Sequence, residues 1–140
     1  MAWIWSAFLF SNNPIGPFFV SADRYVFATP MWNLGVPAMF KAYLDTANVA
    51  GKTFKYTKNG PIGLLENKKA LHIHATGGIY STGPAKQFEH SDSYVKSLMN
   101  FIGVIEYESI LVEGMDFEPD KSQEIKQNAI NKALEIARSF

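Results

Sequence analysis

The feature that most constrains the fold is a short apolar run that leads into a stiff loop and then into a helical pattern. Residues 25–28 are apolar, Pro30 and Pro37 bound the loop, and helix-like spacing extends from Ala38 to Val49. Strand, loop and helix in this order form the repeating unit of parallel α/β sheets. Because ligands of such sheets bind beyond the carboxyl ends of the strands, this loop is a candidate binding element.

The loop carries side chains that suit a flat, partly polar ring. Met31, Trp32 and Leu34 offer apolar surface, and Asn33 offers amide donors and an acceptor. This mixture favours a ring system over a phosphate or a metal ion as the ligand. The residues alone leave open the alternative that Trp32 only packs on a neighbouring helix or subunit.

The same strand-to-loop order recurs further along the chain. Residues 69–75 predict a second strand, which ends in a loop with adjacent glycines, Gly77 and Gly78. This loop matches neither a Walker loop nor the dinucleotide fingerprint. We expect loops 30–35 and 75–80 to face one crevice. A hydride or electron reaction there would need a cofactor, because no side chain in these loops carries that chemistry.

The remaining pattern completes an α/β chain with a mostly parallel sheet. Helices are predicted over 92–102 and from Pro119 onward, and a third strand is predicted over 107–112. Low polarity on both faces of the first strand predicts that helices cover both of its sides. The first helix is expected to stop at Gly51, and an alternating stretch with a turn at 58–61 follows it.

Composition excludes several classes of function. The chain has 140 residues with 13 acidic and 13 basic side chains, so charge gives no case for nucleic acid or an anionic membrane as a partner. Cysteine is absent, which excludes thiolate catalysis and is compatible with the cytoplasm. The apolar residues 1–10 lack a basic flank and are too short for a membrane span.

Other candidate residues have simpler structural explanations. His72 and His74 point to one face of a strand, which is the start of a metal site, yet packed and hydrogen-bonded histidines are the favoured interpretation. His90 is expected in a solvated loop. The acidic residues near the third strand are expected to be solvated: Glu106, Glu108 and Glu113.

Several of these stretches together resemble one family. Residues 22–33, 37–45, 51–64 and 76–80, together with 101–103 and the pair Glu113-Gly114, are similar to the FMN-dependent NADH-azoreductases. Those proteins are flavodoxin-like flavoenzymes. The resemblance covers residues 18–140, and it implies a flavodoxin-like three-layer parallel sheet.

The resemblance also implies the cofactor and the reaction. The protein would be a cytoplasmic homodimer that holds FMN, takes a hydride from NADH and reduces a quinone or azo compound in ping-pong order, with no side-chain acid or base. The implied FMN-binding residues lie in the two loops: Met31, Trp32, Asn33, Leu34, Ala75, Thr76, Gly77 and Gly78.

The N-terminus departs from the family pattern. Members begin with a strand, a serine-bearing phosphate loop, a helix and a second strand, and none of these is recognisable in residues 1–17. We therefore expect a divergent segment 1–17 and a partial domain 18–140 with about three of the usual five strands. Three hypotheses follow: an N-terminally incomplete flavin enzyme with weak or no FMN binding, an FMN-free remnant that acts at most as a dimerising module, and an FAD-using quinone-reductase relative.

Overall fold

The computed structural model describes residues 15–140, which form two compact units. Among the described residues, unit 1 comprises 15–25, Ala38–Ala70 and Lys96–Tyr107, and unit 2 comprises Val26–Pro37, Leu71–Val95 and Glu108–Phe140. The predictions for residues 1–14 lie outside the described part, and the division into 1–17 and 18–140 stays a prediction.

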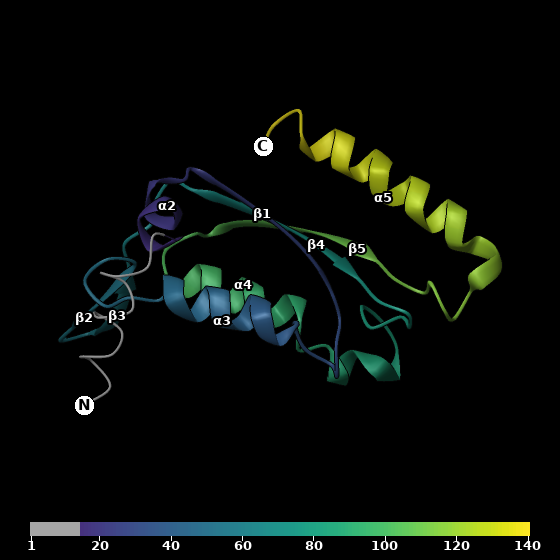
Figure 1. Ribbon diagram of the computed structural model, residues 1–140, viewed down its shortest axis with the longest axis horizontal. Coiled ribbons are helices and arrows are strands. Elements are labelled where there is room, and N and C mark those ends of the chain that lie inside the picture. The colour runs from purple at the N-terminus through teal and green to yellow at the C-terminus, as the bar shows by residue number, and fades with distance from the viewer. Residues whose placement is uncertain (1–14) are drawn as a thin grey trace. The chain divides into compact units, whose positions relative to one another are not determined.

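The central sheet has three strands, β1 (Arg24–Pro30), β4 (Lys69–Ala75) and β5 (Glu106–Val112), in the order β1-β4-β5 (Figure 1). The bounds agree within about one residue with the three predicted strands. The amide of Lys69 donates to the carbonyl of Asp23 in unit 1, and the amide of Met31 donates to the carbonyl of Ala75 in unit 2. Residue numbers increase in the same direction along β1 and β4 between these two bonds, so the two strands are parallel.

The helices of the described chain are α2 (Ile15–Ser21), α3 (Ala38–Ala47), α4 (Asp92–Phe101) and α5 (Ser122–Ile136), with short 3₁₀ turns η1 (Pro84–Phe88) and η2 (Pro119–Lys121). The predicted helix at 92–102 is confirmed, with its last residue at Phe101. The last helix begins at Ser122 and not at the predicted Pro119, because the 3₁₀ turn η2 occupies Pro119–Lys121. Gly103 ends α4 with a φ of 102°. Helix α2 was not predicted, because it lies across the turn signals at Gly16 and Pro17.

Helix α3 ends earlier than the sequence predicts. Its last residue is Ala47, and the side-chain amide of Asn48 donates to the carbonyl of Leu44 at 3.0 Å. Gly51, the expected stop, instead forms the turn before β2 with a φ of 82°. The alternating stretch becomes a hairpin of β2 (Phe54–Thr57) and β3 (Gly60–Gly63).

The prediction that both faces of the first strand are covered is wrong for the described residues. Buried and exposed positions alternate along β1, and Val26 is 57% exposed. An all-apolar run has the same composition whether one face or two are covered, so low polarity did not distinguish the cases.

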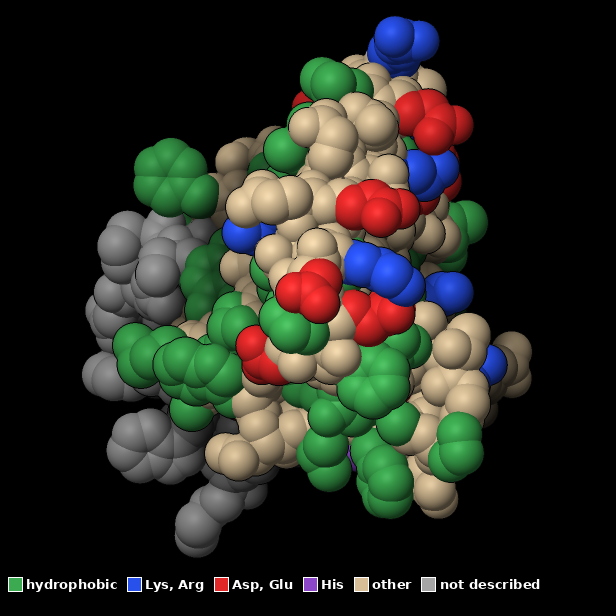
Figure 2. All heavy atoms as spheres, turned by 90° about the vertical axis from the view of Figure 1, so that its right-hand side faces the viewer, with side chains coloured by type: hydrophobic (Ala, Val, Ile, Leu, Met, Phe, Trp, Pro, Cys, Tyr) green, Lys and Arg blue, Asp and Glu red, His purple; other side chains and the backbone are tan. Residues whose placement is uncertain are grey.

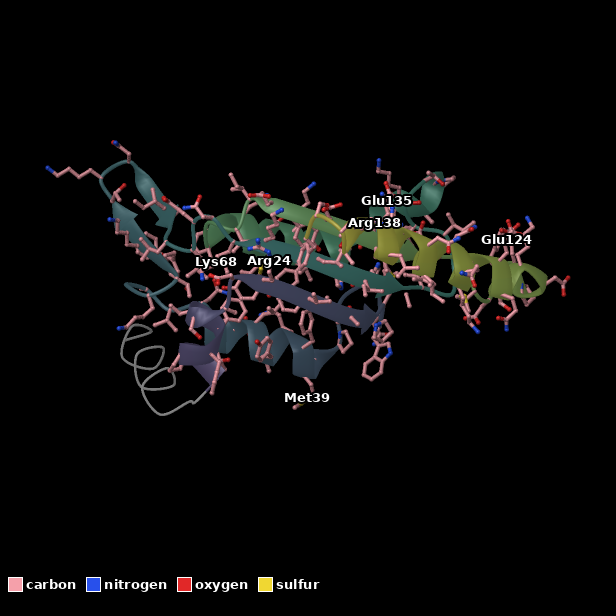
Figure 3. The ribbon with its side chains drawn as sticks, turned by 90° about the horizontal axis from the view of Figure 1, so that it is seen from above. Arg24, Met39, Lys68, Glu124, Glu135 and Arg138 are labelled. Atoms are coloured by element: carbon pink, nitrogen blue, oxygen red, sulfur yellow. The ribbon has the colours of Figure 1, made fainter. Side chains whose placement is uncertain are left out.

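Each unit has its own core. In unit 1, Phe19 stacks on Tyr25 with ring centroids 4.6 Å apart, and Leu44 is fully buried. The ammonium group of Lys68 donates to the carbonyl of Val20 (Lys68 is labelled in Figure 3). In unit 2, Leu71, Ile110 and Ile136 form the centre, against which Ala129 and Ala133 of α5 pack.

Charged side chains of both signs are interspersed on the face drawn in Figure 2. This agrees with the balanced composition of 13 acidic and 13 basic residues. Within residues 15–140, no helix is long and apolar enough to cross a membrane.

Candidate functional site

The two loops predicted to form a site meet in unit 2. The amide of Met31, just past β1, donates to the carbonyl of Ala75 at the end of β4, with a nitrogen–oxygen distance of 2.9 Å. This bond places the first residue of one loop beside the last strand residue before the other. Both loops that the sequence predicts to face one crevice therefore begin at the same edge of the sheet.

The first loop is a two-residue turn with unusual backbone geometry. Trp32 and Gly35 exchange two backbone hydrogen bonds of 2.9 and 3.0 Å, and the residues between them, Asn33 and Leu34, have φ values of 48° and 68°. Two successive positive φ values define a type I′ turn, which Asn tolerates and Leu does not favour. The turn, rather than Pro30 and Pro37 alone, sets the conformation of this loop.

The apolar side chains of this turn are exposed to solvent. Trp32 is 61% exposed, and Leu34 is also exposed. The carbonyl of Leu34 accepts the amide of His90, which ties the turn to the segment before α4. Strained, exposed apolar residues held in a rigid turn are typical of ligand-binding positions.

The second loop is hydrogen-bonded to the end of β5 and to the segment that follows it. The amide of Thr76 donates to Val112, its carbonyl accepts Met115, and its hydroxyl donates to Gly78. Thr76 is 4% exposed, so its polar groups hold the loop in shape. The carbonyl of Gly77 accepts the amides of both Asp116 and Phe117.

Gly77 lies close to Asp116 in this loop. A Cβ at Gly77 would overlap the Asp116 carboxylate, which is the end of an exposed side chain. The lack of a side chain at Gly77 therefore leaves space for this carboxylate.

Backbone donors remain available in both loops. Among the described residues, nothing accepts the amide hydrogens of Asn33, Leu34, Gly77 or Gly78. Together with the exposed Trp32, these donors fit the polar edge and the apolar face of a ring.

Glu113 is a supporting residue that the sequence interpretation missed. Its Oε1 accepts the amides of Tyr80 and Ser81, both at 2.8 Å. The expectation that this carboxylate is merely solvated is wrong. Its position directly after a strand and before Gly114 was the available signal, since such a carboxylate reaches the neighbouring strand-end loop.

The two histidines of β4 differ in whether they are hydrogen-bonded. His72 is packed and hydrogen-bonded, as favoured: Nε2 lies 2.8 Å from Thr29 Oγ1, and Nδ1 lies 2.8 Å from Asp92 Oδ1. Asp92 also accepts the hydroxyl of Ser109 at 2.7 Å. His74 is buried but neither ring nitrogen has a partner among the described residues. No group of three metal-ligating side chains occurs within residues 15–140.

Three further side chains were expected to be solvated. His90, Glu106 and Glu108 are exposed, in agreement with expectation. None of them lies in either loop.

Comparison with known proteins decides the family. Residues 18–137 match the model of the family described as having a flavodoxin-like fold. The chain belongs to this family. The FMN-dependent NADH:quinone oxidoreductase 3 of Bacillus anthracis is 58% identical over 122 residues, which make up 87% of this chain and 58% of that relative.

Solved structures agree with this flavodoxin-like assignment. An azoreductase from Bacillus anthracis str. Sterne has a TM-score of 0.88 and 41% identity, covering 96% of this chain and 64% of that one. An FMN-dependent NADH-azoreductase from Bacillus anthracis str. Ames Ancestor, solved in complex with FMN, has a TM-score of 0.83 and 34% identity, covering 89% and 59%. The resemblance seen in the sequence is confirmed. The chain spans 58% of the length of the first curated relative.

Proposed function

We propose that this chain carries the flavin-ring site of an FMN-dependent NADH oxidoreductase that reduces quinones and azo compounds. The observation that carries the proposal is the bond between Met31 and Ala75, because it brings unpaired amides of two strand-end loops to one place. When bound, FMN would supply the hydride and electron transfer that no side chain in the loops can perform.

The residues present fit the ring of this cofactor. Trp32 and Leu34 would contact its apolar face. The side-chain amide of Asn33 and the backbone amides of Asn33, Gly77 and Gly78 would donate to its polar edge. Met31, Ala75 and Thr76 complete the proposed set by holding these groups in register. Since both loops are tied to strand ends, the donors are positioned before a ligand arrives.

An apolar cavity beside the second loop suits the electron acceptor. It has a volume of about 470 Å³, and Gly78, Ile79, Tyr80 and Phe117 are among the residues that line it. Gly78 belongs to the proposed ring site as well, so a quinone or azo compound in this cavity would lie next to the ring. In this proposal turnover is ping-pong, and the chain provides no acid or base.

The proposed partners follow from the exposed apolar side chains and the composition. We propose a homodimer in the cytoplasm, with no nucleic-acid or membrane partner. Trp32 and Met39, the latter 83% exposed and labelled in Figure 3, are apolar side chains that a second copy could cover. The competing function, an FMN-free dimerising remnant, would use these exposed side chains for dimerisation without the flavin chemistry.

Steady-state kinetics of the full chain with excess FMN test the proposal. Double-reciprocal plots of NADH oxidation at several quinone concentrations should give parallel lines. Asn33→Gly keeps the turn but removes the side-chain amide, so kcat/KM should fall about tenfold, the value of one good polar contact. Asn59→Gly, at an exposed turn in unit 1, is the matched control and should leave kcat/KM unchanged. Absence of NADH oxidation at any FMN concentration would favour the remnant.

A further inference from the structure

Unit 2 contains a second cavity that the flavin proposal does not use. Its volume is about 320 Å³, and its lining comes from β4, the end of β5, η1 and the start of α4. The lining residues that matter for recognition are His74, Lys86, Glu89, Asp92, Leu111 and Glu113. Three carboxylates therefore face one ammonium group across this space.

His74 adds a buried side chain with unsatisfied hydrogen-bonding groups to this cavity. Its side chain is 1% exposed, it lines the cavity, and both Nδ1 and Nε2 lack a partner among the described residues. An unpartnered buried polar atom costs free energy that a ligand can recover. Burial and then the neighbouring His72 lower the pKa of His74, against the opposing effect of Glu89, Asp92 and Glu113. The neutral ring offers one donor and one acceptor.

The carboxylates differ in how far the protein already uses them. Glu89 accepts three backbone amides at 2.7–3.0 Å, and Asp92 bonds to His72 and Ser109. Glu113 uses Oε1 for the amides of Tyr80 and Ser81, and no described residue donates to its Oε2. One carboxylate oxygen and one imidazole acceptor are thus left for a donor in the cavity.

We propose that this cavity binds a small organic ammonium ion. Its N–H groups would donate to Glu113 Oε2 and to His74, and its apolar body would contact Leu111 and the Tyr80 ring. The excess of negative charge in the lining selects a cation over a neutral or anionic molecule of the same shape. The volume fits a single ring or a short chain.

The test uses the flavin-free full chain and benzylammonium as the probe. Long-range ¹H–¹⁵N NMR should show saturable shifts of the His74 ring nitrogens and none at the exposed His90. Benzyl alcohol, which has the same ring without charge, should bind at least about tenfold more weakly. Because no flavin is present, failure here is independent of the proposed function.

Two variants locate the interaction. Glu113→Gln keeps an oxygen for the loop amides but removes the charge, so affinity should fall about tenfold. Glu108→Gln, on the strand that precedes Glu113 and outside the cavity lining, should leave affinity unchanged. Unmoved His74 signals, or equal binding of benzyl alcohol and benzylammonium, would overturn the proposal. If Glu113→Gln does not fold, the comparison of these probes with the unaltered chain decides.

Discussion

Leu34 is the residue at which the backbone of the candidate site is strained. Its φ of 68° lies in the left-handed region, which costs a leucine about 1 kcal/mol relative to residues that tolerate it. Because the side chain is exposed, little packing would be lost on replacement. The strain is therefore retained at a position where the side chain meets solvent or a ligand.

Replacing Leu34 with a residue that tolerates a positive φ should stabilise the protein. Leu34→Asn relieves the backbone and should raise the free energy of unfolding by about 0.5–1 kcal/mol. Urea unfolding followed by circular dichroism measures this change. Loss of stability would mean that the leucine side chain is held by packing that outweighs the strain.

Tyr25 gives the molecule a predictable response to alkali. Its hydroxyl donates to the carbonyl of Phe19 at 2.7 Å, and burial, followed by Tyr43 and Asp23, raises its pKa to about 12. The native state therefore resists losing this proton more than the unfolded chain, whose tyrosine has a pKa of 10.0. The stabilisation is complete below that value and is lost as pH rises from about 10 to about 12.

Tyr25→Phe tests this assignment. It should cost about 1 kcal/mol at neutral pH by removing the hydrogen bond, and it should reduce the alkaline loss of stability. Urea unfolding at about pH 8 and about pH 11 measures both effects. Tyr56→Phe, at an exposed tyrosine of β2, is the control. An unchanged alkaline loss in Tyr25→Phe would assign the titration to another group.

At the scale of elements, the end of β3 depends on one glycine. A Cβ at Gly63 would overlap the backbone nitrogen of Gly103 and the carbonyl carbon of Ile102. The amide of Leu65 donates to the carbonyl of Ile102 at 2.9 Å, so this contact joins the hairpin to the turn after α4. The overlapping atoms all belong to the backbone of Ile102 and Gly103, so they cannot turn aside as the end of a flexible side chain can.

Gly63→Ala should therefore destabilise unit 1 by about 3 kcal/mol, as overpacking against backbone does. Gly35→Ala is the matched control, because the nearest atom to its Cβ is Trp32 O at 4.0 Å and its φ is not positive. It should cost less than about 1 kcal/mol. Thermal unfolding of both variants measures the difference, and equal melting temperatures would contradict the close approach.

The elements differ in how well the sequence predicts them. Residues 69–75 were predicted to the residue, because an apolar run bounded by lysines and glycines leaves few alternatives. Helix α2 was missed, because Gly16 and Pro17 are turn residues that a first helical turn also tolerates. The cover of β1 was misjudged, because composition does not show what packs on a strand.

The meeting of the two candidate loops could be predicted from the sequence, whereas their detailed conformation could not. Residues 31–34 and 75–78 follow strands, and parallel strands end at one edge, so their meeting could be inferred. The positive φ of Leu34 could not be inferred, since leucine disfavours that conformation. The bonds from the amides of Tyr80 and Ser81 to Glu113 could not be inferred either, since they join residues far apart in the sequence. Whether these residues bind flavin stays a prediction.

At the scale of the molecule, the two units contribute differently to the account. Both proposed binding places lie in unit 2, whose loops extend from the ends of β1, β4 and β5. Unit 1 contains α3 and the hairpin of β2 and β3, with the exposed Met39 as a candidate contact for a second copy. The central claim concerns unit 2 alone: its first two loops form one platform for a flavin ring.

Titration of the ¹⁵N-labelled chain with FMN, followed by amide NMR, tests this claim most directly. The account predicts that the amides of Asn33, Leu34, Gly77 and Gly78 shift together and saturate with one apparent affinity, since one ring contacts both loops. Fast exchange makes the measurement possible even when FMN binds weakly. Saturable shifts confined to one loop, or FMN binding that leaves these four amides unmoved, would contradict the account.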